Sequence, residues 1–148
     1  MKTKAARSLP YLRGYEVVRR LTGYEPNPPQ ERFHRDGTRH RIVAYGRQTG
    51  KTHGAAIEAL AGSLGTEGQP RPVWWVLAPT YDGLQEIWEH VRQWAADSEL
   101  KTLVARITSQ KGNMECEIVR AGVLRGKSAD DPDNLRGPAL HGLVIEEA

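Results

Sequence analysis

The chain has 148 residues, a formal net charge of +3 at pH 7 and one cysteine, Cys116. This length fits one domain with a core of useful size, no apolar run approaches the roughly 20 residues that span a bilayer, and an intrachain disulfide is excluded. The charge is uneven, because residues 1–41 hold ten Lys or Arg and four Asp or Glu. This basic third fits either a surface that binds a polyanion such as DNA or an ordinary solvated surface.

The first segment predicts two helices separated by a break. Ser8 can cap a helix that starts at Leu9-Pro10 and ends at Gly23. The prolines that follow forbid regular helix until Pro29, which suits a first helical turn. In that short helix Gln30 offers an amide donor and an acceptor, which match the edge of adenine. On the spacing alone, a polar residue of a surface helix is the simpler interpretation.

Residues 41–52 predict a phosphate-binding loop. An apolar strand over 41–45 leads through Gly46-Arg47-Gln48-Thr49-Gly50 to Lys51 and Thr52, which open an alanine-rich helix. Glycine lets the backbone approach an anion closely, and the first N–H groups of the helix point at it. Lys51 would add a charge at the β- and γ-phosphates, and Thr52 would offer its hydroxyl to Mg²⁺.

This loop departs from the common pattern in one place. The position of the usual first glycine is occupied by Tyr45, and the glycine comes one residue later, at Gly46. The alternative interpretation is a lone Gly-Lys-Thr in a strand-to-helix turn.

The rest of the chain predicts a sheet with a helix and an insertion. Residues 73–78 form a continuous apolar run, typical of a strand buried on both faces of a parallel sheet. Thr80 can cap the next helix, whose apolar stripe indicates core packing. From Leu103 the apolar period changes to two, which predicts short antiparallel strands with turns at 111–113 and 120–122.

The last predicted strand, Leu143-Val144-Ile145, ends in two carboxylates, Glu146 and Glu147. If this strand lies beside the one over 41–45, Glu146 comes near Thr52 and holds Mg²⁺ directly or through water. Glu147 would then polarise the water that attacks the γ-phosphate. The first carboxylate of such a pair is usually Asp, and the extra methylene of Glu146 favours a water-mediated contact.

Four segments together resemble the large terminase subunit of tailed bacteriophages, the motor that packages DNA into a prohead. The loop 46–52 is similar to the family's variant phosphate loop, and residues 24–34 resemble its adenine-reading glutamine motif. Ala78-Pro79-Thr80-Tyr81 resembles the segment after its second strand. Residues 134–138 followed by 143–148 resemble the loop that leads into its acidic strand.

The resemblance implies an α/β P-loop NTPase fold of the ASCE or RecA-like class. The expected sheet is central, mainly parallel and flanked by helices, it ends after the Walker B strand, and it carries a short antiparallel insertion. Residues 1–148 would form the N-terminal portion of the ATPase domain, without the nuclease domain. We therefore expect either a fragment of a longer protein or the product of a truncated gene, with poor stability or association in isolation.

The resemblance also implies the cofactors ATP and Mg²⁺ and assigns their residues. Lys51, Arg47 and Glu147 would be catalytic, and Thr52 and Glu146 would hold the metal. Nucleotide binding would fall to Gln30, Gly46, Arg47, Gln48, Thr49, Gly50, Lys51 and Thr52.

The implied partners are double-stranded DNA, the portal of the procapsid, the small terminase subunit and further copies in a homo-oligomeric ring, in the host cytoplasm and without a membrane. Two alternatives stay open: another P-loop ATPase of the helicase type, or a fragment that binds nucleotide or DNA without hydrolysis.

Overall fold

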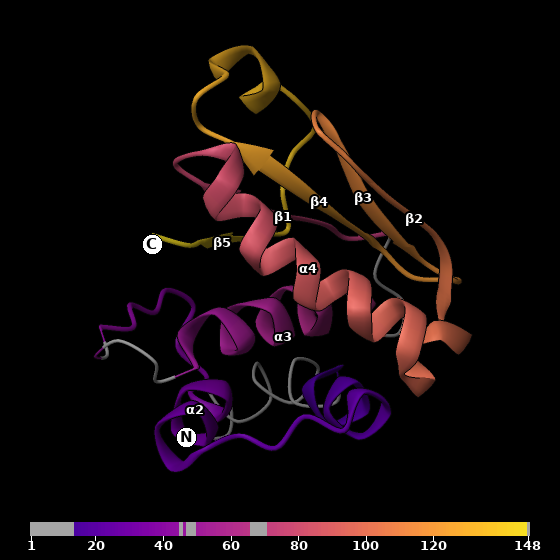
Figure 1. Cartoon of the computed structure of the whole chain (residues 1–148). Helices are drawn as coiled ribbons and strands as arrows, with labels where there is room; N and C mark the ends of the chain where they lie inside the picture. Colours follow the sequence, from indigo (N-terminus) through magenta and orange to yellow (C-terminus); the bar gives the residue numbers. More distant parts are fainter. Residues whose placement is uncertain (1–13, 45, 47–49, 66–70, 148) are drawn as a thin grey trace.

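The computed structural model describes residues 14–44, 46, 50–65 and 71–147. The predicted Ser8 cap therefore lies outside the described residues, but the helix over 14–22 ends at Gly23 as expected. The other elements follow in chain order (Figure 1): α2 (Pro28–Arg35), α3 (Lys51–Leu64), β1 (Val73–Ala78), α4 (Tyr81–Asp97), the 3-10 turn η1 (Glu99–Thr102), β2 (Val104–Gln110), β3 (Asn113–Ile118), β4 (Val123–Ser128), the 3-10 turn η2 (Pro132–Leu135) and β5 (Gly142–Ile145).

The five strands form one mixed sheet in the order β2-β3-β4-β1-β5. Strand β1 pairs in parallel with β4 and β5, whereas β3 pairs antiparallel with β2 and β4. The prediction of a mainly parallel sheet is therefore only partly correct, although the predicted antiparallel strands are present. The reason is that β4 bonds to β1 on one side and to the hairpin on the other, so the insertion extends the central sheet.

The predicted strand over residues 41–45 is wrong for the part that the structure describes. Residues 41–44 have no strand conformation, Ile42 is 96% exposed, and Tyr45 lies outside the described residues. A strand needs a hydrogen-bonded neighbour, since its backbone groups cannot pair within the segment. The described strand β5 pairs with β1 and not with this segment. An apolar pattern was thus not sufficient to place residues 41–44 in the sheet.

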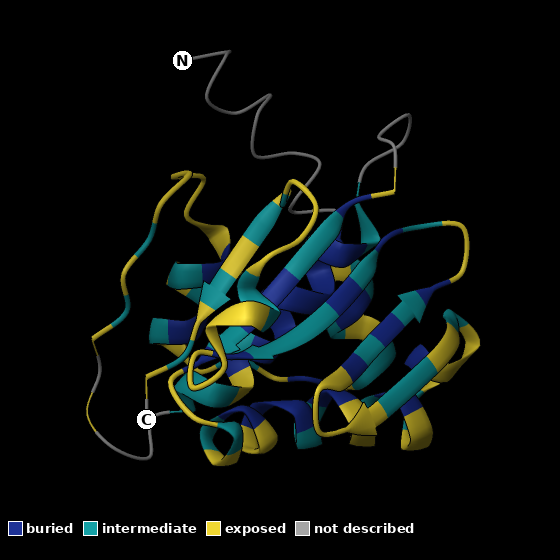
Figure 2. Ribbon diagram, turned by 90° about the horizontal axis from the view of Figure 1, so that it is seen from above, coloured by how far each residue is buried: buried dark blue, intermediate teal, exposed yellow. Residues whose placement is uncertain are grey.

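The core lies between the sheet and helices α3 and α4, which cover the same face of it (Figure 1). In Figure 2 the buried residues concentrate in the central strands and in the helices behind them, while the loops are exposed. The apolar stripe predicted after Thr80 is confirmed as core, and Thr80 caps α4 by accepting a hydrogen bond from the Gly83 N–H at 3.2 Å. The buried members of that stripe are Leu84, Ile87, Trp88, Val91 and Ala95.

The ring of Trp74 fixes β5 and α3 against β1. A Cβ built on Gly62 of α3 would lie 2.2 Å from this ring, and one built on Gly142 of β5 would lie 2.3 Å from it. Both glycines therefore allow an approach that any side chain would block. This contact brings the start of β5 to α3, so the acidic residues after β5 are positioned relative to the same helix.

Cys116 is fully buried in β3, and burial raises the pKa of its thiol to about 12. Since the thiolate is the reactive form, the buried thiol of Cys116 packs as an ordinary core side chain of the strand. Within the described part of the chain, no helix combines the length and apolar character needed to cross a bilayer.

Candidate nucleotide-binding site

The N-terminus of α3 is the centre of the candidate site. Gly50 is the N-cap residue, with φ 79° and ψ 23°, a left-handed conformation that glycine adopts at little cost. It has no side chain to cap the helix, so no N-cap side chain satisfies the N–H groups of the first turn. Lys51 and Thr52 begin the helix and are half-buried. Arg47, Gln48 and Thr49 lie outside the described residues, and Gly46 is exposed.

The acidic strand end lies directly beside this helix start. The Glu146 N–H donates to the Leu77 carbonyl at 2.9 Å, which continues the pairing of β5 with β1. The Thr52 hydroxyl then donates to Glu146 Oε1 at 3.0 Å, across 94 residues of sequence. The structure therefore brings these two predicted site residues together. The sequence predicted this contact from pairing of the acidic strand with a strand over 41–45. In the structure β5 pairs with β1 instead.

The position of the site agrees with the general architecture of α/β sheets. The parallel strands β4, β1 and β5 all end at this edge, and ligands of such folds bind outside the carboxyl ends of the strands. Glu147 comes one residue after Glu146 and is exposed. Its carboxylate is thus available to solvent at the edge where a substrate would bind.

The pair of Thr52 and Glu146 suits a magnesium ion. A hydroxyl and a carboxylate supply the hard oxygen ligands that Mg²⁺ prefers. Adjacent ligands of an octahedral ion at 2.0–2.1 Å lie about 3 Å apart, and the two side-chain oxygens are 3.0 Å apart. The donor set and its spacing therefore fit the ion that the sequence implied.

Gln30 contacts the phosphate loop itself. Its Oε1 accepts from the Asn27 N–H at 2.8 Å, as part of a capping box at the start of α2. Its Nε2 donates to the Gly50 carbonyl at 2.7 Å. One N–H and one lone pair of the amide remain beyond these two bonds. The residue proposed to contact adenine thus also links α2 to the loop.

A cavity of about 450 Å³ opens next to Gln30 and Gly50. Its walls combine polar groups with aromatic rings, as a site for a heterocyclic base requires. They come from Thr22, Gly23, Tyr24, Glu25, Asn27, Gln30, Gly50, His53 and Trp94.

His53 lines this cavity from α3 and contacts His90 of α4, with ring centroids 3.9 Å apart. Burial lowers the pKa of both imidazoles, and the charge of His53 lowers the pKa of His90 further. Both rings are therefore neutral at pH 7 and present an uncharged aromatic surface beside Trp94.

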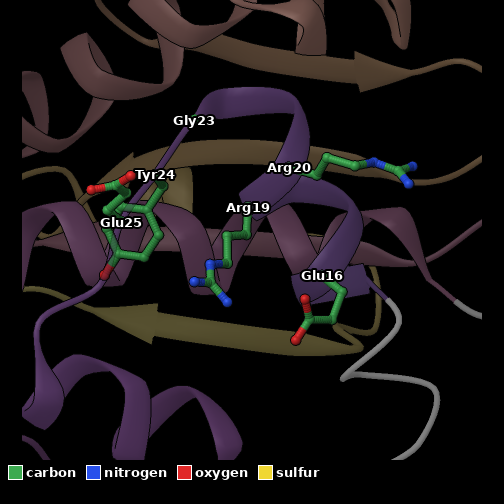
Figure 3. A pocket seen from close by; sticks show the side chains of 6 residues that line it. All are labelled: Glu16, Arg19, Arg20, Gly23, Tyr24 and Glu25. Atoms are coloured by element: carbon green, nitrogen blue, oxygen red, sulfur yellow. The ribbon is translucent and has the colours of Figure 1, made fainter.

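A second cavity, about 330 Å³, shares the lining residues Gly23, Tyr24 and Glu25 with the first. Figure 3 shows Arg19 pointing between Glu16 and Tyr24, while Arg20 points away from them. Two guanidinium groups and the two carboxylates of Glu16 and Glu25 line this cavity. The cavity therefore presents charges of both signs, and Glu16 is also paired with Arg35.

The sequence reasoning missed a buried polar network behind the site. Glu58 of α3 is 2% exposed and accepts hydrogen bonds from His34 and Arg41. A signal was available, because Glu58 is a lone carboxylate between Ala55-Ala56-Ile57 and Ala59-Leu60-Ala61. A charge on a helix face that packs in the core must have partners.

We expect Gly50→Ala to loosen the site. The new Cβ would lie 2.3 Å from Gln30 Nε2, so the amide must move and lose a hydrogen bond worth about 1 kcal/mol. The left-handed backbone adds about 1–2 kcal/mol. Urea denaturation would measure the total, and titration with ATP would show weaker binding.

Gly112→Ala is the matched control, because Gly112 has the same φ of 79° and nothing within 4 Å of the added Cβ. It should show the backbone cost alone and leave ATP binding unchanged. Equal losses in the two variants would contradict the role of the Gln30 contact.

Comparisons with known proteins found similar phage proteins. The chain is 31% identical to the large terminase subunits of Thermus phage G20c and Thermus virus P23-45, with 86% of its length matched. It spans 29% of the length of these curated relatives. No family model matches the chain.

The fold has solved counterparts. The large terminase ATPase domain of Thermus phage P74-26 matches with a TM-score of 0.64 and 30% identity, over 86% of this chain and 55% of that structure. A variant of the same domain matches with a TM-score of 0.63. Sequence and structure thus agree in showing that this chain resembles the ATPase part of the large terminase subunit of tailed bacteriophages.

Proposed function

We propose that this chain is the ATP-binding and ATP-hydrolysing part of a motor that moves viral DNA into a procapsid. The similarity to terminase ATPase domains supports a role in DNA packaging. The single observation that carries the enzymatic part is the Thr52–Glu146 hydrogen bond of 3.0 Å at the start of α3. It joins a phosphate-loop hydroxyl to a carboxylate at the strand edge where nucleotides bind.

In this proposal the helix start and Lys51 hold the phosphates. The N–H groups of the first turn of α3 and the Lys51 ammonium neutralise phosphate charge. Thr52 and Glu146 would hold Mg²⁺, and a bound Mg²⁺ would supply positive charge to the phosphates. Arg47, whose planar fork matches a phosphate, adds a further cation from the loop.

Glu147 acts as the proton acceptor for the attacking water. Glu147 is exposed and follows Glu146, the residue proposed to hold the metal. Because Glu147 is not assigned to the metal, its carboxylate can accept the proton of the attacking water. Gln30 and the neighbouring cavity take the adenine base, with the amide contributing its remaining N–H and lone pair.

The partners of the motor follow from the same proposal. Double-stranded DNA, the portal, the small terminase subunit and neighbouring copies in a ring would contact the chain during packaging in the host cytoplasm. The excess of basic residues before position 42 supports contact with DNA.

Calorimetric titration of the 148-residue chain tests the nucleotide site. We expect saturable binding of ATP that is tighter with Mg²⁺ than with EDTA and tighter than binding of GTP. If ATP does not bind, or binds equally with and without Mg²⁺, the proposed site is wrong. If ATP binds but no phosphate is released, the alternative of a non-hydrolysing fragment is favoured.

A further inference from the structure

The buried side of α2 holds a chain of polar side chains that the nucleotide site does not use directly. Tyr24 contacts His34 Nε2 through its hydroxyl at 3.0 Å, and His34 Nδ1 lies 2.8 Å from Glu58 Oε1. The Arg41 guanidinium donates to both oxygens of Glu58, at 3.2 and 2.8 Å. His34 is fully buried and stacks on Tyr15 with ring centroids 4.6 Å apart.

The donors and acceptors of this network match one another. A carboxylate only accepts, so His34 Nδ1 carries the proton that bonds to Glu58. His34 Nε2 pairs with the Tyr24 hydroxyl, a group that can donate or accept. The Arg41 cation forms an ion pair with the Glu58 carboxylate, which compensates its buried charge. Every polar atom that these contacts involve is paired, which is the condition for a stable buried network.

Glu58 connects three segments that meet at the nucleotide site. His34 belongs to α2, the helix that places Gln30 against the Gly50 carbonyl. Arg41 belongs to the segment that enters the phosphate loop, and it also donates to the Phe33 carbonyl at 2.9 Å. Glu58 itself lies on α3, seven residues after Lys51 and thus on the same helix face.

The contact between α2 and α3 is close along this face. A Cβ on Gly54, one turn before Glu58, would lie 3.8 Å from the Tyr24 hydroxyl, 3.9 Å from His34 Nε2 and 4.0 Å from Gln30 Cγ. The residues of the network and the residue that contacts the phosphate loop therefore pack on one stripe of α3. A shift of α2 along that stripe would move Gln30 away from Gly50.

We propose that Glu58 is a positioning residue of the nucleotide site. Through His34 and Arg41 it holds α2 and the segment before the phosphate loop in fixed positions on α3, so that Gln30 stays on Gly50 and beside the base cavity. This inference rests on the proposed function. It adds that base recognition depends on a carboxylate that does not touch the nucleotide.

Glu58→Gln is the direct test. The glutamine amide has one acceptor oxygen where three N–H groups of His34 and Arg41 now donate, and its own NH₂ meets donors. We expect the Kd for ATP to rise at least tenfold and the preference for ATP over GTP to shrink, because Gln30 no longer stays in place. Calorimetric titration measures both, and circular dichroism at the same temperature reports whether the variant is folded.

Arg41→Lys is the second variant, for the case that Glu58→Gln does not fold. It keeps the charge but cannot bond both Glu58 oxygens and the Phe33 carbonyl at once. We expect Arg41→Lys to reduce the preference for ATP over GTP as well, by less than Glu58→Gln does. Arg35→Lys is the matched control. Arg35 lies on α2, the helix that carries Gln30 and His34, and pairs with Glu16 and Glu31, but its side chain is 48% exposed. It should leave the Kd and the base preference unchanged.

The outcomes separate this inference from the proposed function. If the wild-type chain binds ATP and the folded variants bind ATP and GTP as it does, the positioning role is overturned and the nucleotide site remains. A lower melting temperature with an unchanged preference for ATP over GTP also overturns the positioning role. That result would show that Glu58 stabilises the fold without affecting base recognition. If the wild-type chain does not bind ATP, the proposed function fails and this inference fails with it.

Discussion

Replacing Lys51 with alanine is expected to lower ATP turnover by about 10²–10³-fold, the effect of removing one preorganised charge donor from a transition state. Lys51 is the first residue of α3, next to the Gly50 cap and one residue before Thr52. Its ammonium would lie where the β- and γ-phosphates meet the helix start. The affinity for ATP should also fall, by about 10- to 100-fold, because a hydrogen bond to a charged group is lost. Phosphate release and calorimetric titration measure the two effects.

Lys101→Ala is the control for the loss of a lysine. Lys101 lies exposed in η1, far along the chain from the phosphate loop. Its removal should change neither turnover nor affinity. If Lys51→Ala behaved like Lys101→Ala, the helix start of α3 would not be a phosphate site.

Glu147→Gln is expected to preserve ATP binding and lower phosphate release by about 10²–10⁴-fold, the usual contribution of a general base. The amide has nearly the same shape but cannot accept the proton of the attacking water. The effect should therefore appear in kcat, while the affinity for Mg²⁺ and ATP stays close to that of the wild type. Single-turnover phosphate release with pre-bound ATP separates the chemical step from binding.

The exposed Glu99 of η1 provides the matching control, as Glu99→Gln removes a carboxylate that follows the far end of α4. A Glu147→Gln variant that released phosphate at the wild-type rate would show that another group takes the proton. A variant that no longer bound ATP would instead assign Glu147 to binding.

Local patterns allowed much of this fold to be predicted. The apolar run before Pro79 became β1, the cap at Thr80 started α4, and the period of two after Leu103 became the hairpin of β2 and β3. Each of these features depends on residues that are close in sequence. The meeting of Thr52 with Glu146 was also expected, but through a strand over 41–45 that the structure does not show; pairing of β5 with β1 places Glu146 there instead.

The features that could not be predicted depend on distant partners. Residues 41–44 have an apolar pattern, but only a hydrogen-bonded neighbour makes a strand, and β5 pairs with β1 instead. The sheet is mixed because β4 pairs with β1 on one side and with the hairpin of β2 and β3 on the other. The periodicity of apolar residues does not indicate which strands become neighbours. The pairing of Glu58 with His34 and Arg41 likewise joins three segments that no local pattern connects.

The central claim is that Thr52 and Glu146 hold one Mg²⁺ together with ATP. It is tested most directly by the gain in ATP affinity that Mg²⁺ produces, compared in the wild type, Thr52→Val, Glu146→Gln and the double variant. We predict that each single variant loses most of this gain and that the double variant loses little more, because both groups act on one ion. An unchanged gain in both single variants, or independent and additive losses, would contradict the claim.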